Sequence, residues 1–343
     1  MIHARLAALT LSLALFGGQA IAASTHTLLD WSDLDGWAED DHAAAVTTFL
    51  ETCTDLEGRH WEAICAAAQD QGADRSFFEV FFRPVLIEDG LAGLFTGYYE
   101  PELSGSKVRT ATHRWPIYRK PPEVQAGSRW YSRGEIEEQG LLSGRGLEIA
   151  WIDDPVDVFF LQIQGSGRIR LPDGTGIRVG YGGRNGHDYR SVGNEMVRRG
   201  LFQSHQVSAA TIRNWVRQNP EEGARLLRHN PSYIFFREVT AVPSSAGPLG
   251  AMNRSVTTLR SIAVDPEYVT LGAPVWIETD GATPFRRLMI AQDTGSAIKG
   301  AQRADIFFGT GAEAGRAAGK VRDPGRMIVL LPVEEALRLT GEG

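Results

Sequence analysis

Three aspartates in the last third of the chain have the residue type and spacing expected for acid–base chemistry. Asp265, Asp293 and Asp305 each lie at the end or the start of an apolar, strand-like run, and all three fall within 41 residues. Strands of this kind deliver carboxylates to the rim of a sheet, and the glycines among them would allow a ligand to approach the backbone closely. A single aspartate at a strand end usually forms a turn or a cap. The grouping of three therefore indicates a site.

Asp293 also begins an Asp-Thr-Gly triplet, which is typical of aspartic peptidases when it follows an apolar strand. Peptidase chemistry needs two carboxylates that share one proton, supplied by two such loops. This chain contains one such triplet, and a homodimer that supplied the second copy would have unusually long subunits. The sequence therefore disfavours a peptidase.

Other common catalytic patterns are absent from the sequence. The eight histidines are scattered and show no spacing typical of a metal site. There is no G-x-S-x-G nucleophile turn and no phosphate-binding P-loop pattern. The Gly-Ser-Gly at 165–167 is too short for either pattern, and we interpret it as a tight turn between two strands.

The elements that must position the aspartates are predicted to be mainly strands. Apolar spacing predicts helices over 40–87, and helical patterns return at 191–199, 208–218 and 220–228. Short strand-like runs bounded by Gly and Pro lie at 91–103, 114–122, 146–154, 156–171 and 174–183, and further ones fill 233–332. We therefore expect a mainly β protein with helical additions.

Length and composition narrow the class of protein. The chain has 343 residues, 43% of them hydrophobic and 22% charged, which fits a globular protein and excludes wholesale disorder. This length suggests roughly two domains of about 150 residues. With 35 Lys and Arg against 42 Asp and Glu the net charge is −7, which argues against nucleic acid as the main partner.

The first 22 residues resemble a secretory signal peptide. A positive charge at Arg5 precedes an apolar run over 6–16, and the segment ends in Ala20-Ile21-Ala22, an A-x-A cleavage pattern. The apolar run is short for a membrane span, although a signal anchor remains an alternative. The leader contains no cysteine to accept a lipid. We expect an exported, soluble periplasmic protein, or one loosely associated with the outer membrane or the wall.

The two cysteines of the chain, Cys53 and Cys65, lie twelve residues apart between helical patterns. In an exported protein an even number of cysteines indicates disulfide formation, here across a helix-turn-helix. Two buried free thiols are the alternative.

Four groups of residues occur together in one order along the chain. They are Gly97-Tyr98-Tyr99-Glu100-Pro101, Gln162-Ile163-Gln164-Gly165-Ser166-Gly167, Ala263-Val264-Asp265-Pro266 with Leu271-Gly272, and Asp293-Thr294-Gly295 followed by Ile298-Lys299-Gly300 and Asp305. In this combination the chain resembles the family of membrane-bound lytic murein transglycosylase A, whose C-terminal part is the three-aspartate domain.

The resemblance implies a fold and an activity. The fold would be a double-psi β-barrel formed by 23–103 and 240–343, with helical N-terminal additions, a second β domain inserted at 104–239, and a substrate groove between the two domains. The activity would be that of an exolytic transglycosylase that cleaves the β-1,4 bond between N-acetylmuramic acid and N-acetylglucosamine without water. It would leave 1,6-anhydromuramoyl ends and use no metal or organic cofactor.

The resemblance also implies roles for individual residues. Asp305 would be the single acid/base, and Asp293 would support it, or replace it if the loop before Asp305 differs in length from that of relatives. To hold a proton near neutral pH, Asp305 needs a raised pKa. Asp265 would fix a loop or contact substrate, and Lys299 would bind a substrate carboxylate or remain a surface lysine. The remaining candidates for the groove are Tyr98, Tyr99, Glu100, Gln164, Ser166 and Thr294. Because a strand alternates its faces, only one of the two tyrosines should point into the groove.

Two rival functions remain open at this stage. One is a true hydrolase with Asp305 as acid and Asp293 as base, since ordinary glycosidases use two carboxylates. The other is a wall-binding or wall-loosening module without catalysis. The expected partners are peptidoglycan strands, together with cell-wall synthesis or division proteins, and the expected state is a monomer.

Overall fold

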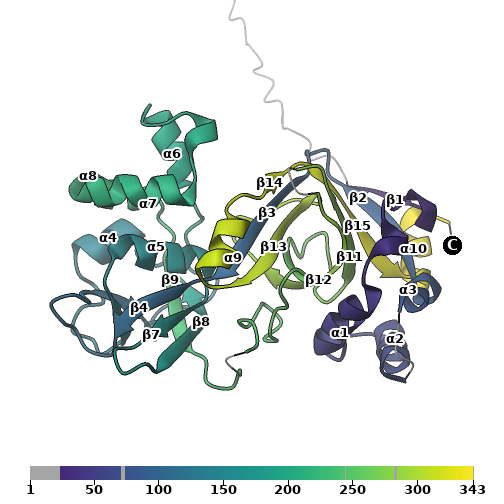
Figure 1. Cartoon of the computed structure of the whole chain (residues 1–343), viewed down its shortest axis with the longest axis horizontal. Coiled ribbons are helices and arrows are strands. Elements are labelled where there is room, and N and C mark those ends of the chain that lie inside the picture. The colour runs from purple at the N-terminus through teal and green to yellow at the C-terminus, as the bar shows by residue number, and fades with distance from the viewer. Residues whose placement is uncertain (1–23, 71–73, 244, 282–283, 343) are drawn as a thin grey trace, which may run out of the picture.

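The computed structural model describes residues 24–70, 74–243, 245–281 and 284–342, so the leader predicted at 1–22 lies outside the described residues. The chain forms two β-sheets with helices packed around them, and Figure 1 shows each sheet in its own lobe. The prediction of a mainly β protein with helical additions is confirmed. In the part of the chain that the structure describes, no helix is long and apolar enough to cross a membrane.

The larger sheet has nine strands, drawn from both ends of the chain. In spatial order they are β1 Thr25–Leu28, β2 Phe82–Glu88, β15 Gly325–Pro332, β11 Pro274–Thr279, β12 Arg286–Thr294, β10 Ser261–Val264, β13 Arg303–Thr310, β3 Leu94–Glu100 and β14 Arg322–Asp323. The pairs β10–β12 and β13–β3 are parallel, and the other neighbours are antiparallel. Strands that are far apart in the sequence are therefore brought side by side around the aspartates.

The smaller sheet has six strands, which come from the middle of the chain. Their order is β5 Trp115–Tyr118, β6 Glu148–Ile152, β4 Glu102–Ser106, β7 Gly167–Arg170, β8 Gly176–Arg184 and β9 Ile234–Glu238. A single residue, Pro101, separates β3 of the larger sheet from β4 of the smaller one. The chain thus passes from one lobe to the other within one extended segment.

Helices cover both sheets. The larger-sheet lobe has η1 Trp31–Asp33, η2 Trp37–Glu39, α1 His42–Cys53, α2 Arg59–Asp70, α3 Arg75–Phe81, α9 Gly311–Ala318 and α10 Val333–Thr340. The smaller-sheet lobe has α4 Arg133–Glu138, α5 Pro155–Gln164, α6 Val192–Arg198, η3 Ser204–Gln206, α7 Ala209–Gln218 and α8 Pro220–Leu227. The helices predicted at 191–199, 208–218 and 220–228 are confirmed, with Ser208 capping α7 through the backbone N–H of Thr211.

The main hydrophobic core lies between the larger sheet and the N-terminal helices. Its largest fully buried side chains are aromatic: Phe49, Phe78, Phe82, Phe95 and Trp276. The predicted disulfide is confirmed, because Cys53 at the end of α1 is bonded to Cys65 in α2, with Cα atoms 5.6 Å apart. This bond joins the two helices across the turn between them.

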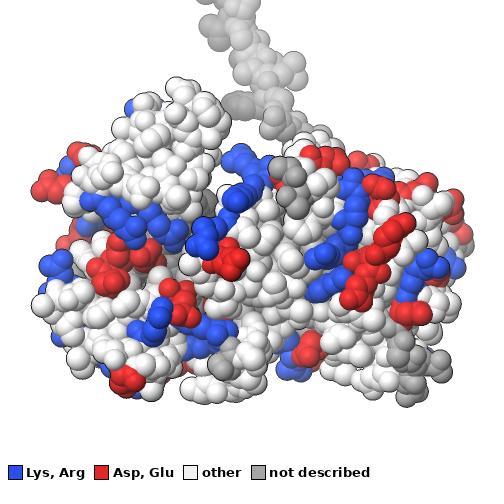
Figure 2. All heavy atoms as spheres, in the orientation of Figure 1, with Lys and Arg blue, Asp and Glu red and all other residues white. Residues whose placement is uncertain are grey.

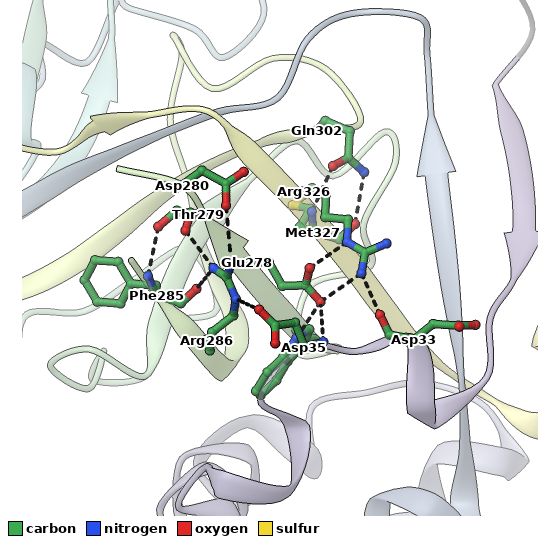
Figure 3. Close-up of polar contacts among 11 residues, drawn as sticks. Asp33, Asp35, Glu278, Thr279, Asp280, Phe285, Arg286, Gln302, Arg326 and Met327 are labelled. Atoms are coloured by element: carbon green, nitrogen blue, oxygen red, sulfur yellow. Dashed lines mark hydrogen bonds and ion pairs between the residues drawn. The ribbon is translucent and has the colours of Figure 1, made fainter. Parts of the chain in front are cut away.

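A polar network fixes the segment before α1 to the larger sheet (Figure 3). Glu278 on β11 and Arg326 on β15 are register partners, and their side chains form an ion pair of 2.6 Å. Glu278 also accepts a hydrogen bond from the backbone N–H of Asp35, and Arg326 donates one to the carbonyl of Asp33. The charges of Glu278 and Arg326 are therefore paired with each other and hydrogen-bonded to the N-terminal segment that covers them.

Two of the predicted elements were wrong. The run 156–171 was predicted as a strand, but its first part is helix α5, which Asp154 caps through the N–H of Val156 and which begins with Pro155. Gly165 ends this helix with φ 77°, so the turn predicted at Gly-Ser-Gly joins a helix to a strand rather than two strands. The helical pattern over 40–87 ends earlier than predicted, because β2 begins at Phe82. An apolar run of this length fits a buried strand as well as a helix.

Candidate active site

Four side chains form a row across neighbouring strands of the larger sheet. Asp305 on β13 is the register partner of Thr96 on β3 and of Ala263 on β10, and Ala263 in turn pairs with Asp293 on β12. Residues in register on adjacent strands share one face of a sheet. The two aspartates therefore point to the same side, with one strand between them. Two strand spacings place their Cα atoms about 10 Å apart.

A β-bulge at Gln292 sets the direction of Asp293. The pairing of β10 with β12 runs from Ile262–Ala291 directly to Ala263–Asp293, so β12 has one extra residue at that point. Without the bulge Gln292 would face Ala263, and Asp293 would point to the other face of the sheet. Gln292 instead turns inward, where its amide donates hydrogen bonds to the Thr48 carbonyl and the Thr52 hydroxyl.

Strand β3 contributes residues to the site from one of its faces. Thr96, Tyr98 and Glu100 alternate with Gly97 and Tyr99, which face helix α9. A Cβ on Gly97 would lie 2.8 Å from the Cα of Ala318, so only glycine allows α9 to pack so closely. The sequence predicted that only one tyrosine would point into the groove. The two tyrosines do face opposite sides of β3, with Tyr98 towards Asp293 and Tyr99 towards α9.

Asp305 is half-buried, and one of its carboxyl oxygens is fixed by a hydrogen bond. The hydroxyl of Thr96 donates to Oδ1 of Asp305 over 2.6 Å, and Arg303 donates to the same hydroxyl oxygen over 2.8 Å. Because a guanidinium can only donate, the threonine hydrogen is directed at Asp305. Among the described residues Oδ2 has no hydrogen-bond partner. Burial raises the pKa of Asp305, and the hydrogen bond from Thr96 and the charge of Arg303 oppose this rise.

Asp293 has hydrogen-bond partners on both carboxyl oxygens. The Tyr98 hydroxyl donates to Oδ2 over 2.9 Å, and the backbone N–H groups of Ala251 and Thr294 donate to Oδ1 over 3.0 Å and 2.9 Å. Burial raises the pKa of Asp293 to about 6, and these donors pull it down while the charge of Asp305 adds to the rise. The donors all favour the ionised form of Asp293.

Asp265 holds the loop that leads into β13. It is buried and accepts hydrogen bonds from the N–H of Gly300 over 3.0 Å and from Nζ of Lys299 over 3.1 Å. Burial alone would raise the pKa of Asp265, but the hydrogen bonds outweigh it and hold the pKa below its usual value. Asp265 therefore fixes the loop, while Lys299 and Thr294 are exposed beside it.

The other predicted site residues lie where the two sheets meet. Glu100 is fully buried, and its carboxylate forms ion pairs with Arg168 (2.8 Å) and Arg178 (2.9 Å) of the smaller sheet. These contacts join the lobes, which differs from the groove-lining position expected for Glu100. Gln164 accepts a hydrogen bond from the N–H of Tyr99 over 3.0 Å, so it also links the lobes. Ser166, in the turn between α5 and β7, is buried.

Comparisons with known proteins agree with the arrangement of the two sheets. A family model described as the MltA specific insert domain matches residues 94–237, and one described as the 3D domain matches 260–331. Membrane-bound lytic murein transglycosylase A of Escherichia coli K12 is 38% identical over 244 residues, 69% of this chain and 65% of that protein. The Vibrio cholerae protein of the same name is 32% identical over 246 residues, 68% of this chain and 64% of that protein. The matched stretch thus spans slightly less than two thirds of these relatives.

Solved structures match over nearly their whole length. A membrane-bound lytic murein transglycosylase from Agrobacterium tumefaciens has a TM-score of 0.81 and 34% identity, over 92% of this chain and 99% of that one. The chain belongs to the membrane-bound lytic murein transglycosylase A family. The E. coli MltA structure with bound chitohexaose has a TM-score of 0.73 and 30% identity, over 92% of this chain and 98% of that one.

In this member of the MltA family, the 3D-domain match contains Asp265, Asp293 and Asp305. Sequence reasoning missed Thr96 and Arg303, which contact each other and fix Asp305. A signal for each was present, because Thr96 lies two residues before Tyr98 and Arg303 two residues before Asp305, the spacing at which strand residues share a face. The pairing of β3 with β13, 209 residues apart at Thr96 and Asp305, could not be read from the chain alone.

Proposed function

We propose that this protein is a peptidoglycan lytic transglycosylase with Asp305 as its single acid/base. The bond cleaved would be the β-1,4 bond between N-acetylmuramic acid and N-acetylglucosamine, and the product a 1,6-anhydromuramoyl end. The observation that supports this role most directly is the difference between the two carboxyls. Both oxygens of Asp293 accept hydrogen bonds, whereas Oδ2 of Asp305 has no partner among the described residues and can hold a proton towards substrate.

In the first step of this mechanism, protonated Asp305 donates its proton to the leaving O4 while the bond from C1 to O4 breaks. Burial supports this step because it raises the pKa of Asp305, so that more of the acid form is present near neutral pH. Thr96 holds Oδ1 through its hydrogen bond, which leaves Oδ2 as the oxygen that carries the proton.

In the second step, the same carboxylate accepts the proton of the C6 hydroxyl of the muramoyl unit while O6 attacks C1. One bond to C1 breaks and one forms within the sugar, and Asp305 ends in its starting protonation state. No water is consumed. A hydrolase would need a second carboxylate as base or nucleophile, and Asp293 is poorly suited because Tyr98 and two backbone amides occupy its oxygens.

The negative charge of Asp293 would act both on Asp305 and on the substrate. An ionised Asp293 on the same sheet face disfavours a second negative charge and so favours the protonated form of Asp305. The same charge would stabilise the positive character that C1 acquires as the glycosidic bond breaks.

We also propose the finer architecture that the family resemblance implies. Residues 23–103 and 240–343 would form a double-psi β-barrel with 104–239 as the inserted domain, and the glycan would bind between them. Thr96, Asp305 and Asp293 lie in a row on one face of the larger sheet, and β3, which carries Thr96, leads through Pro101 into the smaller sheet; this supports the placement. The chitohexaose bound to E. coli MltA supports a glycan strand as ligand. The protein would act as a periplasmic monomer.

The product of murein digestion tests the function. Purified protein is incubated with murein and the fragments are analysed by mass spectrometry. We expect anhydromuramoyl ends, whereas reducing muramic ends would support the hydrolase, and binding without any product would support a wall-binding module.

The variant Asp305→Asn tests the acid. It should bind murein as the wild type does and form no product, while Asp188→Asn, a matched change at an exposed surface aspartate, should leave turnover unchanged. Circular dichroism of both variants shows whether they are folded. Turnover by folded Asp305→Asn would refute the assignment of Asp305.

A further inference from the structure

The row formed by Thr96, Asp305, Ala263 and Asp293 continues by one strand to an arginine, Arg322. Arg322 on the edge strand β14 is the register partner of Thr96, so Arg322, Thr96, Asp305, Ala263 and Asp293 lie side by side on five adjacent strands. Register partners share a face of the sheet. Arg322 therefore stands on the same face as the two aspartates, two strands from Asp305 and about 10 Å from it at the Cα atoms.

The side chain of Arg322 is exposed. Among the described residues it has neither an ion pair nor a side-chain hydrogen bond. By contrast, Arg326, which follows on the next strand in the chain, is held by Glu278. An exposed edge-strand arginine that has no partner in the described parts of the chain is available to a ligand.

Arg303 lies beside Arg322 and adds a second positive charge. Arg303 on β13 donates a hydrogen bond over 2.8 Å to the hydroxyl of Thr96, and Arg322 is the register partner of Thr96 on the other neighbouring strand, so the two arginines flank the same residue. The charge of Arg322 helps to lower the pKa of Arg303, after the larger effect of burial. Arg303 is fixed by hydrogen bonds to the carbonyls of Leu94 and Ala304 and to Thr96. Figure 2 shows basic side chains along the boundary between the lobes, with acidic side chains beside some of them.

The positive charge of Arg322 and Arg303 matters because the two kinds of glycan that the site could accept, chitin-type glycan and murein, differ in charge. Chitin-type oligosaccharides such as chitohexaose are neutral. Murein has a lactyl group on each muramoyl unit, which ends in a carboxylate when the peptide is absent and continues into a peptide with carboxylates when it is present. A murein strand thus brings negative charge to a face that already holds two aspartates.

We propose that Arg322, supported by Arg303, binds a carboxylate on the muramoyl substituent and makes the site prefer murein to neutral glycan. This inference rests on the proposed function, because it assigns a substrate contact to the same site. A guanidinium recognises carboxylate through paired, charge-assisted hydrogen bonds. The contact also places the muramoyl substituent on the β14 side of Asp305, which orients the strand in the site.

The experiment compares Arg322→Gln with the wild type, using the full chain and three ligands. The ligands are chitohexaose, murein glycan freed of peptide, and murein fragments with their peptides. Affinities are measured by calorimetry at two salt concentrations, and KM and kcat are measured on murein. Arg316→Gln on the neighbouring helix α9 removes the same charge from an exposed position nearby and serves as the matched control.

We expect Arg322→Gln to weaken the affinity for anionic murein ligands about tenfold and to raise KM with little change in kcat. Chitohexaose affinity and all properties of Arg316→Gln should stay near wild type. If only the affinity for peptide-free glycan falls, the group that Arg322 binds is the lactyl carboxylate. If only the affinity for peptide-bearing fragments falls, it is a peptide carboxylate. High salt should reduce the difference between the variants.

The inference is overturned if murein affinity is unchanged, or if chitohexaose affinity falls by the same factor, which would indicate a structural role for Arg322. An equal loss in Arg316→Gln would indicate a general field effect rather than a contact. Failure of the proposed function would look different, because the wild type would then release no anhydromuramoyl product.

Discussion

Asp293 and Asp305 lie opposite the same residue, Ala263, one on each neighbouring strand. This relationship places two carboxyls on one face of the sheet, and the charge of Asp305 helps to raise the pKa of Asp293. Hydrogen bonds then distinguish the pair, since Asp293 is saturated with donors and Asp305 keeps one oxygen open. Two residues of the same type are thereby given different roles.

The raised pKa of Asp293 predicts a cost in stability at neutral pH. Its pKa of about 6 in the folded protein lies above its ordinary value of 3.8, so the folded state binds this proton more tightly. The contribution of Asp293 to stability should therefore fall as pH rises from about 4 to about 6 and then level off. Asp293→Asn removes this titration and should be more stable than wild type at pH 8 by roughly 1–3 kcal/mol, with little difference at pH 4. Urea unfolding at several pH values measures this, and a constant difference between the two proteins would contradict it.

Thr96 should control both the rate and the pH profile. Thr96→Val keeps the shape of the side chain but removes the hydrogen bond that stabilises ionised Asp305. The pKa of Asp305 should rise further, so the alkaline limb of kcat/KM should move to higher pH. Because the carboxyl also loses its anchor, we expect kcat to fall about tenfold. Thr96→Ser retains the hydroxyl and should restore both properties, and a pH profile that does not differ between Val and wild type would refute this role.

Much of the site could be predicted from local sequence, but its geometry could not. The apolar runs before Asp265, Asp293 and around Asp305 predicted strands, and β10, β12 and β13 are strands. The bulge at Gln292, which decides where Asp293 points, depends on pairing with β10 and has no local signal. The spacing of Thr96 from Tyr98 indicated a shared strand face, but the contact of Thr96 with Asp305, 209 residues away, had no local signal. Pairing between distant strands sets register, and register decides which side chains meet.

The strand 156–171 was predicted wrongly for a different physical reason. Its apolar residues satisfy both a strand and a buried helix, so periodicity alone does not decide between them. The decisive signals were at the ends, where Asp154 and Pro155 begin helix α5 and Gly165 ends it. Cap residues of this kind are local and were available from the sequence.

Glu100 should be essential for joining the two lobes. Glu100→Gln leaves Arg168 and the buried Arg178 without a countercharge, and breaking a buried pair from one side costs about 3–5 kcal/mol. Glu102→Gln is the matched control, because Glu102 forms an exposed ion pair with Arg170 (2.8 Å). That pair should contribute less than about 1 kcal/mol. Urea unfolding of both variants measures the difference, and similar losses would show that the Glu100 network does not depend on burial.

The small side chain of Ala263 should be needed for Tyr98 to reach Asp293. It is buried between the two aspartates and packs in one cluster with Tyr98 and Phe307. Ala263→Val suits a strand backbone but overfills this cluster, which typically costs about 1–3 kcal/mol. We expect Tyr98 to be displaced and its hydrogen bond to Asp293 to be lost, so the pKa of Asp293 should rise above about 6. Carboxyl-carbon NMR titration measures this pKa.

Ala150→Val provides the comparison for this prediction, because Ala150 is equally buried but lies in β6 of the smaller sheet. It should lose similar stability and keep the pKa of Asp293 at the wild-type value. If both variants leave that pKa unchanged while Ala263→Val alone loses turnover, the larger valine side chain blocks substrate, and Ala263 is needed to leave room for substrate rather than to place Tyr98. If Ala263→Val changes the pKa and turnover together, the small residue between the aspartates is what allows Tyr98 to hold Asp293 in its ionised role.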